Sequence, residues 1–131
     1  MDTSFKELTP AEEQVMQALW KINEGYANVI VASVSEGLQN EDGTSANAPA
    51  YNTILTVVRI LEKKGFVGHK TFNKSNQYYP LISREDYSRN LLCRLSNRFF
   101  GSSFREMLSF LVDRKDITIE DIDAIVKELE Q

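Results

Sequence analysis

The hydrophobic pattern of this chain changes its period at Gly65, and that change restricts the fold more than any other feature of the sequence. Before Gly65, apolar residues recur every three or four positions, as they do along one side of a helix. After it, residues 66–72 and 77–81 alternate in the manner of half-buried strands, and residues 73–76 between them read as a turn. We therefore expect a helical segment followed by one β-hairpin.

Three helices are predicted ahead of this hairpin. The first begins at Pro10, because Thr9 can cap its N-terminus and Glu12 completes a capping box. The second covers residues 27–38 and the third covers residues 49–64. Gly65 is expected to end the third helix in the left-handed conformation. Three helices followed by a β-hairpin are the layout of a winged helix, mainly α with a small β-hairpin wing. The apolar positions that we expect these helices to bury are Val15, Met16, Leu19, Trp20, Ile30, Val31, Val34, Leu38, Ile54, Val57, Val58 and Leu61.

Two details of the connections are also predicted. Residues 39–49 are polar, with Asp42–Gly43 as a turn, and we expect them to form a loop between the second and third helices. Pro80 has no backbone N–H, and it therefore predicts that the end of the second strand lies at a sheet edge.

Residues 83–131 return to the helical period. Ser83, Ser102 or Ser103, and Thr118 can each cap a helix, which gives three amphipathic helices. About 50 residues are too few to bury three apolar faces, so these helices either fold back on the winged helix or pair with a second chain, and symmetric pairing is the commoner solution. We expect a winged-helix domain over residues 1–82 and a helical dimerisation segment over residues 83–131. The side chains assigned to the dimer are Leu91, Leu95, Phe99, Phe104, Met107, Leu108, Leu111, Ile122, Ile125 and Leu129.

The charges of the chain are unevenly distributed. The net charge is −4, which by itself argues against a partner as acidic as nucleic acid. Residues 50–80, however, carry five basic side chains against the single acidic Glu62, whereas residues 1–49 carry two basic against eight acidic ones. Phosphate attraction acts within about 10 Å, so a local basic region matters more than the total. On charge alone, a solvated surface patch explains the region equally well.

The third helix and the hairpin have the residue types of a DNA-reading surface. Asn52 can read adenine, Thr53 or Thr56 can reach bases or phosphates, and Leu55 can meet a thymine methyl. Basic side chains towards the end of the helix and on the wing can neutralise phosphates, and those of the wing are spaced for a neighbouring groove. Periodicity alone also allows a generic amphipathic helix, but the charge segregation and the hairpin favour DNA. The predicted DNA-binding residues are Tyr51, Asn52, Thr53, Leu55, Thr56, Arg59, Lys63, Lys64, Lys70 and Lys74.

Motifs for catalysis, metal binding and cofactor binding are absent from the sequence. It has no Gly-rich phosphate loop, no nucleophile elbow and no zinc-protease motif. His69 and Cys93 fall in different elements, and the single cysteine excludes an internal disulfide and a multi-cysteine zinc site. Asp121 and Asp123 suit the first turn of a helix better than acid–base chemistry. We therefore expect no enzyme, no metal and no cofactor.

Two further classes of protein are disfavoured. The N-terminus is not a secretory signal and no apolar run reaches the roughly 18–20 residues of a membrane-spanning helix, so the expected compartment is the cytoplasm. Aromatic residues of the hairpin could form a stacking platform for single strands, but alternation makes a sheet core the better interpretation. Those residues are Phe66, Phe72, Tyr78 and Tyr79.

Four ordered blocks of the chain resemble the penicillinase-repressor family. Residues 8–12 (LTPAE) are similar to its opening, and residues 50–65, from AYNTILT to LEKKG, to its recognition helix. Residues 78–85 (YYPLISRE) are similar to the exit from its wing, and residues 99–102 (FFGS) to the start of its dimerisation helices. The resemblance covers residues 5–131. It implies a homodimeric winged-helix repressor that occupies a palindromic operator of double-stranded DNA.

The resemblance also bears on how such a repressor is released. In the β-lactam branch of the family a membrane sensor-protease triggers cleavage in the middle C-terminal helix, which corresponds here to the bond between Ser109 and Phe110. This chain has Ser109 where Asn is usual, so proteolytic release stays an open alternative. The copper-sensing branch carries a cysteine-rich C-terminal motif that this sequence lacks. The connection 39–49 is long and acidic for the family, and Leu55 stands where some members carry a base, which suggests a different operator.

Two other functions stay open at this point. A winged helix can serve as a protein–protein adaptor without DNA-binding activity, with the acidic surface as its working face. A hydrolase would need a pocket containing a perturbed carboxylate or His69, and nothing in the sequence requires one. Binding to duplex DNA separates the first of these from the repressor.

Overall fold

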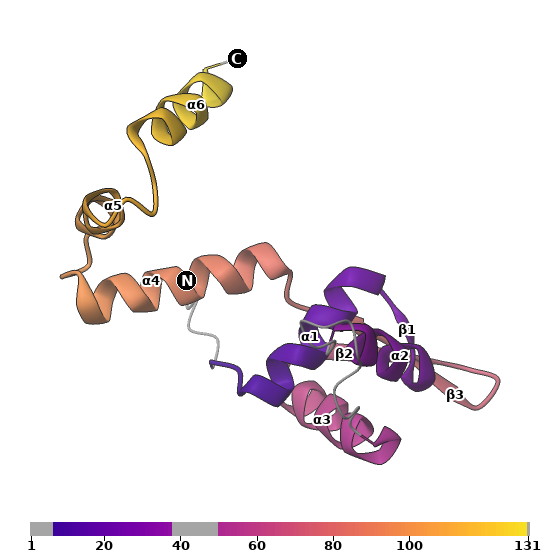
Figure 1. Ribbon diagram of the computed structural model, residues 1–131. Helices are drawn as coiled ribbons and strands as arrows, with labels where there is room; N and C mark the ends of the chain where they lie inside the picture. The colour runs from indigo at the N-terminus through magenta and orange to yellow at the C-terminus, as the bar shows by residue number, and fades with distance from the viewer. Residues whose placement is uncertain (1–6, 38–49, 131) are drawn as a thin grey trace. The chain divides into compact units, whose positions relative to one another are not determined.

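The computed structural model describes residues 7–37 and 50–130, and the chain divides into two compact units, Met1–Ser88 and Arg89–Gln131 (Figure 1). The division falls inside a helix, and the predicted boundary after residue 82 stays a prediction. None of the helices in these ranges is long and apolar enough to cross a membrane. The elements are α1 (Pro10–Ile22), β1 (Gly25–Tyr26), α2 (Ala27–Gly37), α3 (Tyr51–Lys64), β2 (Val67–Phe72), β3 (Ser75–Pro80), α4 (Arg84–Phe99), α5 (Phe104–Asp113) and α6 (Ile119–Leu129).

The predicted helix boundaries of the first unit are largely confirmed. Thr9 caps α1, and its capping box with Glu12 is present on both sides. Gly65 ends α3 with a φ of 87°, the left-handed conformation that glycine adopts without strain. Helix α3 begins at Tyr51, and Ala50 at its N-cap makes no side-chain bond. The predicted loop 39–49, including Pro49, lies outside the described residues, as does Leu38.

The sheet has one more strand than the sequence predicts. Strand β1 is only two residues long and pairs antiparallel with β3, so the order is β1-β3-β2. Strand β3 is therefore central, but its end at Pro80 lies at a sheet edge, as the sequence predicts. Pro80 is tolerated because β1 pairs only with Tyr78 and Gln77, which leaves the β1 side of Pro80 without a partner strand.

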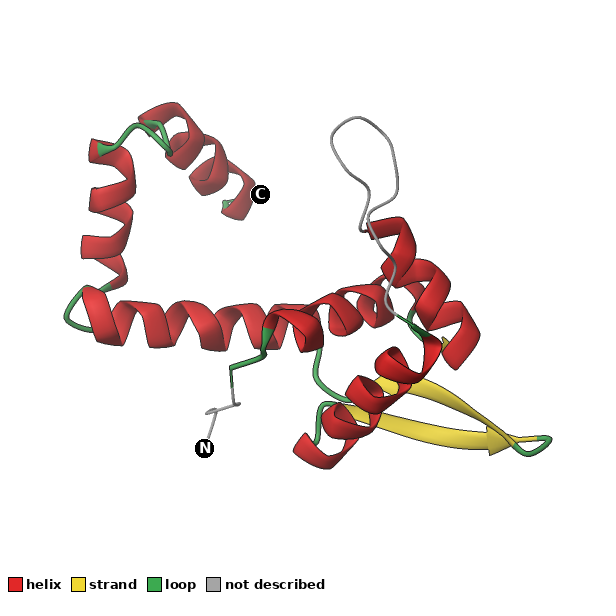
Figure 2. Ribbon diagram, turned by 60° about the horizontal axis from the view of Figure 1, so that its bottom comes forward, coloured by secondary structure: helices red, strands yellow, loops and turns green. Residues whose placement is uncertain are grey.

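The hairpin turn is also tighter than predicted. Phe72 pairs with Ser75, so Asn73 and Lys74 alone make the turn, with φ values of 47° and 67° (the long yellow strands and their connection in Figure 2). Two consecutive residues of positive φ match the right-handed twist of the flanking strands. The wing therefore has a narrow and well-defined tip.

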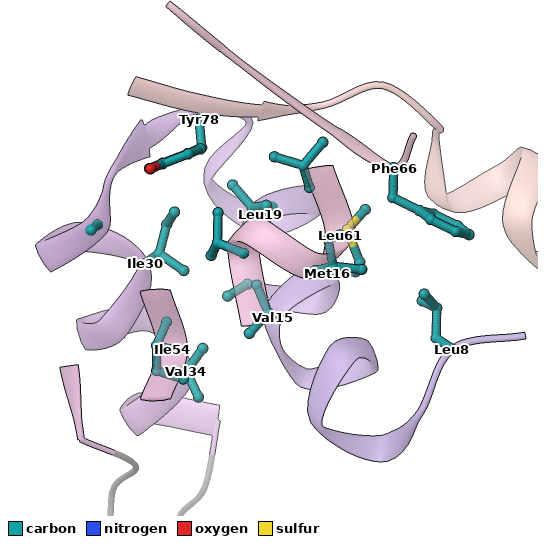
Figure 3. Packing of buried hydrophobic residues seen from close by; sticks show 14 of the residues in the cluster. Leu8, Val15, Met16, Leu19, Ile30, Val34, Ile54, Leu61, Phe66 and Tyr78 are labelled. Atoms are coloured by element: carbon teal, nitrogen blue, oxygen red, sulfur yellow. The ribbon is translucent and has the colours of Figure 1, made fainter. Parts of the chain in front are cut away.

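The core of the first unit lies where the three helices meet the sheet (Figure 3). Val15, Met16 and Leu19 of α1 are fully enclosed, and Ile30 and Leu61 complete the packing from α2 and α3. The other predicted core positions Val34, Ile54 and Val58 are buried too, and Trp20, Val31 and Val57 are half-buried against the cluster. Phe66 and Tyr78 point into this core, as the alternation of the hairpin predicts, whereas Phe72 does not.

Two long-range hydrogen bonds close the first unit. The indole Nε1–H of Trp20 donates to the backbone oxygen of Ile82 at 2.9 Å. The backbone N–H of Leu8 donates to the hydroxyl of Tyr87, also at 2.9 Å. The bonds tie α1 and the residues just before it to the segment that follows the wing, and Tyr87 is itself buried. The start of α4, whose N-terminus Ser83 caps as predicted, is thus part of this unit.

The second unit is helical throughout. Ser103 caps α5, and Thr118 caps α6 in a capping box with Asp121. Gly101, with a φ of 58°, ends the turn after α4. The rings of Phe100 and Phe110 pack 5.6 Å apart between centroids. Few side chains are enclosed in this unit, and α6 has no buried residue.

Candidate nucleic-acid interface

Helix α3 buries one face and leaves the other open to solvent. Ile54, Val58 and Leu61 are buried in the core. The opposite face is exposed and carries the polar side chains that the sequence assigns to DNA, which are Asn52, Thr53, Thr56, Arg59 and Lys63. The hydroxyl of Thr56 donates to the backbone oxygen of Asn52 at 2.9 Å, so it is oriented by its own helix. An exposed polar face on a helix held by its other face is the geometry that major-groove reading requires.

The apolar residue on this outer face is a different one from that expected. Leu55 is half-buried and packs against the core cluster, so it is less available to a thymine methyl than the sequence suggests. Ile60, by contrast, is 42% exposed and lies one helical turn beyond Thr56. The sequence contains the signal for this position, since Ile60 lies four residues after Thr56 and three before Lys63, on the same side of the helix.

An open groove of about 570 Å³ runs between α3 and the wing. Tyr51, Leu55 and Arg59 line it from α3, and Asn28 lines it from the start of α2. The wing contributes residues 72–76. Tyr51, which is exposed, and Arg59 therefore stand on the same groove as Lys74, although fifteen residues separate the two cations in sequence.

Three cations of this region make no ion pair with any other residue in the described ranges. They are Arg59 and Lys63 on α3 and Lys74 in the wing turn, and all three are exposed. Such side chains can neutralise phosphates without first breaking an internal contact. Of the five predicted basic contacts, these three are the ones that the structure leaves available.

Lys64 is held on the far side of α3. Its Nζ lies 2.6 Å from Oε2 of Glu12, and the side chains are only 27% and 5% exposed. Burial acts to raise the pKa of Glu12, but the bond from Lys64 and those with Thr9 outweigh it, so this pKa lies below its ordinary value. We therefore leave Lys64 out of the proposed phosphate contacts: its charge is already used to join the end of α3 to the start of α1.

Lys70 is also engaged within the chain. Its Nζ lies 3.3 Å from Oε2 of Glu24, and it stands 5.9 Å from the ring centre of Phe72 and 5.7 Å from that of Tyr79. The Glu24 pair is half exposed, so it exchanges readily with water or phosphate. Lys70 thus lies along the wing with its charge close to two aromatic faces.

His69 contacts Glu62 through Nδ1, and its ring lies 5.9 Å from that of Tyr78. This contact joins the end of α3 to the base of the wing. Cys93 lies in the other unit and is half-buried. His69, which the hydrolase alternative would use, is accordingly a helix–wing contact, and Cys93 is a partly buried side chain of the other unit.

The residues assigned to the dimer differ in exposure. Leu91, Leu95, Phe99, Phe104, Leu108, Ile125 and Leu129 are exposed. Leu111 and Ile122 are half-buried, and Met107 is buried within the chain. Met107 is therefore less available to a second chain than the sequence suggests. Ser109 and Phe110, at the candidate cleavage bond, are exposed and lie within helical backbone of α5.

Three helices, a hairpin wing and an exposed polar face on the third helix define a winged-helix DNA-binding protein. Comparisons with known proteins agree. A sequence model of the penicillinase repressor family matches residues 8–131. The methicillin resistance regulatory protein MecI of Staphylococcus aureus (strain N315) is 28% identical over 125 residues, covering 95% of this chain and 94% of that protein. The penicillinase repressor of Bacillus licheniformis is 26% identical over 125 residues, covering 95% and 91%.

The similarity extends to a solved structure. The solution structure of the DNA-binding domain of the repressor BlaI is 25% identical, with a TM-score of 0.50, over 64% of this chain and 92% of that one. The chain belongs to the penicillinase repressor family. It is a transcriptional repressor with a winged-helix DNA-binding domain and not an enzyme.

Proposed function

We propose that this repressor binds a palindromic operator as a homodimer formed by its C-terminal helices. The observation that carries the proposal is the apolar surface of residues 89–131. Phe99, Ile119 and Leu129 are 66%, 65% and 80% exposed, and eight further large apolar side chains of the unit are exposed with them. Exposed apolar surface of this extent marks an interaction site on a soluble domain. A symmetric pair is the commonest way to cover such a surface.

The DNA contacts follow from α3 and the wing. Asn52, Thr53 and Thr56 occupy the first turns of α3, where side chains reach base edges in the major groove. Arg59, Lys63 and Lys74 contact phosphates on either side, and Tyr51 stands at the edge of the groove between them. A two-fold dimer presents this surface twice, which favours a palindrome whose half-sites are spaced by about one helical turn.

Selection of bound sequences from random duplex DNA tests the proposal. The expected product is an inverted repeat, and sedimentation of the full chain at the same concentration should give the mass of a dimer. Enrichment of single, unpaired half-sites would contradict the dimeric arrangement. Failure to bind any duplex even at low salt would favour the protein–protein adaptor instead.

Release by cleavage between Ser109 and Phe110 is a further part of the proposal, supported by the family resemblance alone. Both residues lie in α5, whereas a protease needs an extended substrate, so the helix must open locally before it is cut. Mass analysis of the repressor from induced cells checks this. A fragment ending at Ser109 is expected, and an intact chain during full induction would exclude a membrane sensor-protease as the partner that releases it.

A further inference from the structure

The outer face of the wing carries an ordered row of side chains that the DNA contacts above do not use. Gly68, Lys70 and Phe72 share one face of β2, because alternate residues of a strand point to the same side. Tyr79 of β3 is opposite Gly68 in the register, and Ser75 is opposite Phe72. The Lys70 ammonium lies within 6 Å of both ring centres, so the row reads Tyr79, Lys70, Phe72 towards the tip.

The row is a built feature of the wing. A Cβ at position 68 would come within 2.9 Å of the Tyr79 ring, so this ring lies across the strand only because residue 68 is glycine. Lys70 also pairs with Glu24 at 3.3 Å. Tyr79 is half-buried, whereas Lys70 and Phe72 are exposed, so Phe72 is the aromatic member of the row that is open to solvent, at 48% exposure.

We propose that Phe72 enters the minor groove next to the recognition helix and acts as an apolar wedge, so that the wing selects operators by the deformability of a base step. This inference rests on the proposed function. Phe72 is the last residue of β2 before a two-residue turn, and it lines the same groove as Arg59 and Lys74. The wedge is thus continuous with the surface that holds the phosphates.

The dimensions of the wing tip fit this role. Paired strands are about 4.8 Å apart, and a two-residue turn is the narrowest end that a hairpin can present. The minor groove of B-DNA is about 6 Å wide, so a side chain at the end of such a tip can enter it, whereas the flat of the sheet cannot. Apolar side chains inserted there partly unstack a base step, and pyrimidine–purine steps yield most easily. Lys70 beside the ring adds a cation where the groove is most negative.

The test uses the full chain and duplexes derived from its selected operator. A series of duplexes is made in which one flexible TpA step occupies successive positions in the flank of each half-site, and the rest of the flank is stiff sequence. The affinity of the repressor for each duplex is measured at one salt concentration. The parent should prefer one position of the step by about tenfold, which is within the discrimination of a single base pair. Phe72→Ala should lose this preference, and Phe72→Leu should keep most of it, because leucine preserves an apolar wedge.

Lys74→Ala is the matched control, since residue 74 lies in the same turn. It should keep the positional preference but reduce the salt dependence of binding by about 0.9 per phosphate contact, whereas Phe72→Ala should leave the salt dependence unchanged. Thermal melting checks that each variant is folded. A parent without positional preference, or a Phe72→Ala variant that keeps it, overturns this inference while DNA binding stands. A parent that binds no duplex overturns the proposed function itself.

Discussion

The two units of this repressor differ in what happens to their apolar side chains. In the first unit, residues from three helices and the sheet enclose one another, and the cluster from Leu8 to Tyr87 is closed within the chain. In the second unit, Met107 is the one buried hydrophobic residue among those that the structure describes, while Phe99 and Leu129 are largely exposed. Both units have comparable amphipathic helices. The difference teaches that a helical pattern guarantees a buried face only when the same chain supplies something to bury it against.

The largest effect is expected from a charged side chain placed on the exposed apolar surface of the second unit. Leu108→Glu should convert the dimer to monomers and weaken operator binding by at least about a hundredfold, because two half-sites then bind independently. Sedimentation and gel-shift titration measure the two effects. Glu106→Gln, on the other side of α5, is the control and should change neither. A Leu108→Glu protein that sediments as a dimer would show that this face is not the interface.

In the first unit, the stability of the fold should depend most on the ion pair between Lys64 and Glu12. Lys64→Met should lower the free energy of unfolding by about 3 kcal/mol, because it leaves the buried carboxylate of Glu12 without its partner. Glu12→Gln should cost only about 1 kcal/mol, since the amide can keep the bond to Thr9 and Lys64 can turn to water. Denaturant titration measures both. If the two variants lost equal amounts of unfolding free energy, the unpaired carboxylate of Glu12 would not be the cause of the loss.

The same pair makes stability depend on pH. The pKa of Glu12 is lowered from its ordinary 4.5 in the folded chain, so its contribution is complete above that pH and is lost as the pH falls through the lowered value. Unfolding measured from pH 7 to pH 3 should show this loss in the parent. The loss should be smaller in Lys64→Met, in which the largest interaction that lowers the pKa is gone.

Substitutions on the outer face of α3 should have smaller effects, and these should be on operator binding and not on stability. Arg59→Ala and Lys63→Ala should each weaken operator binding about tenfold near physiological salt and reduce its salt dependence. Lys64→Met, one residue further along, should bind with an unchanged salt dependence because its ammonium faces Glu12. Fluorescence titrations over a range of salt concentrations measure this. A reduced slope for Lys64→Met would place Lys64 on DNA after all.

The smallest expected effect concerns a buried hydroxyl in the second unit. Ser96 is 1% exposed, and its Oγ makes no hydrogen bond to the part of the chain that the structure describes. Ser96→Ala should therefore raise the free energy of unfolding by up to about 1 kcal/mol, whereas the exposed Ser88→Ala should leave it unchanged. Thermal melting compares the two. A destabilised Ser96→Ala would mean that the dimer supplies a partner for this hydroxyl.

Much of the fold was predictable because its determinants are local. Thr9 with Glu12, Ser83, and Gly65 act within a few residues of themselves, and the change of period marks where helix gives way to strand. Strand β1 was not predictable, since two residues carry no periodicity and Gly25 pairs with Tyr78 from far along the chain. For the same reason the sequence did not show that β3 is the central strand, although the edge position predicted for its end at Pro80 is confirmed.

The candidate site, too, has one part that local sequence predicts and another that depends on contacts between distant residues. The outward-facing residues of α3 could be predicted from the sequence, because burial of Ile54, Val58 and Leu61 leaves the opposite side to solvent. Which of the cations on α3 are available to DNA depends instead on how the helix packs against the rest of the unit. Lys63 and Lys64 are adjacent and chemically identical, but a helix turns 100° per residue, and this turn carries Lys64 to Glu12, 52 positions earlier in the chain. Pairing of this kind depends on contacts between distant residues, which no local pattern contains.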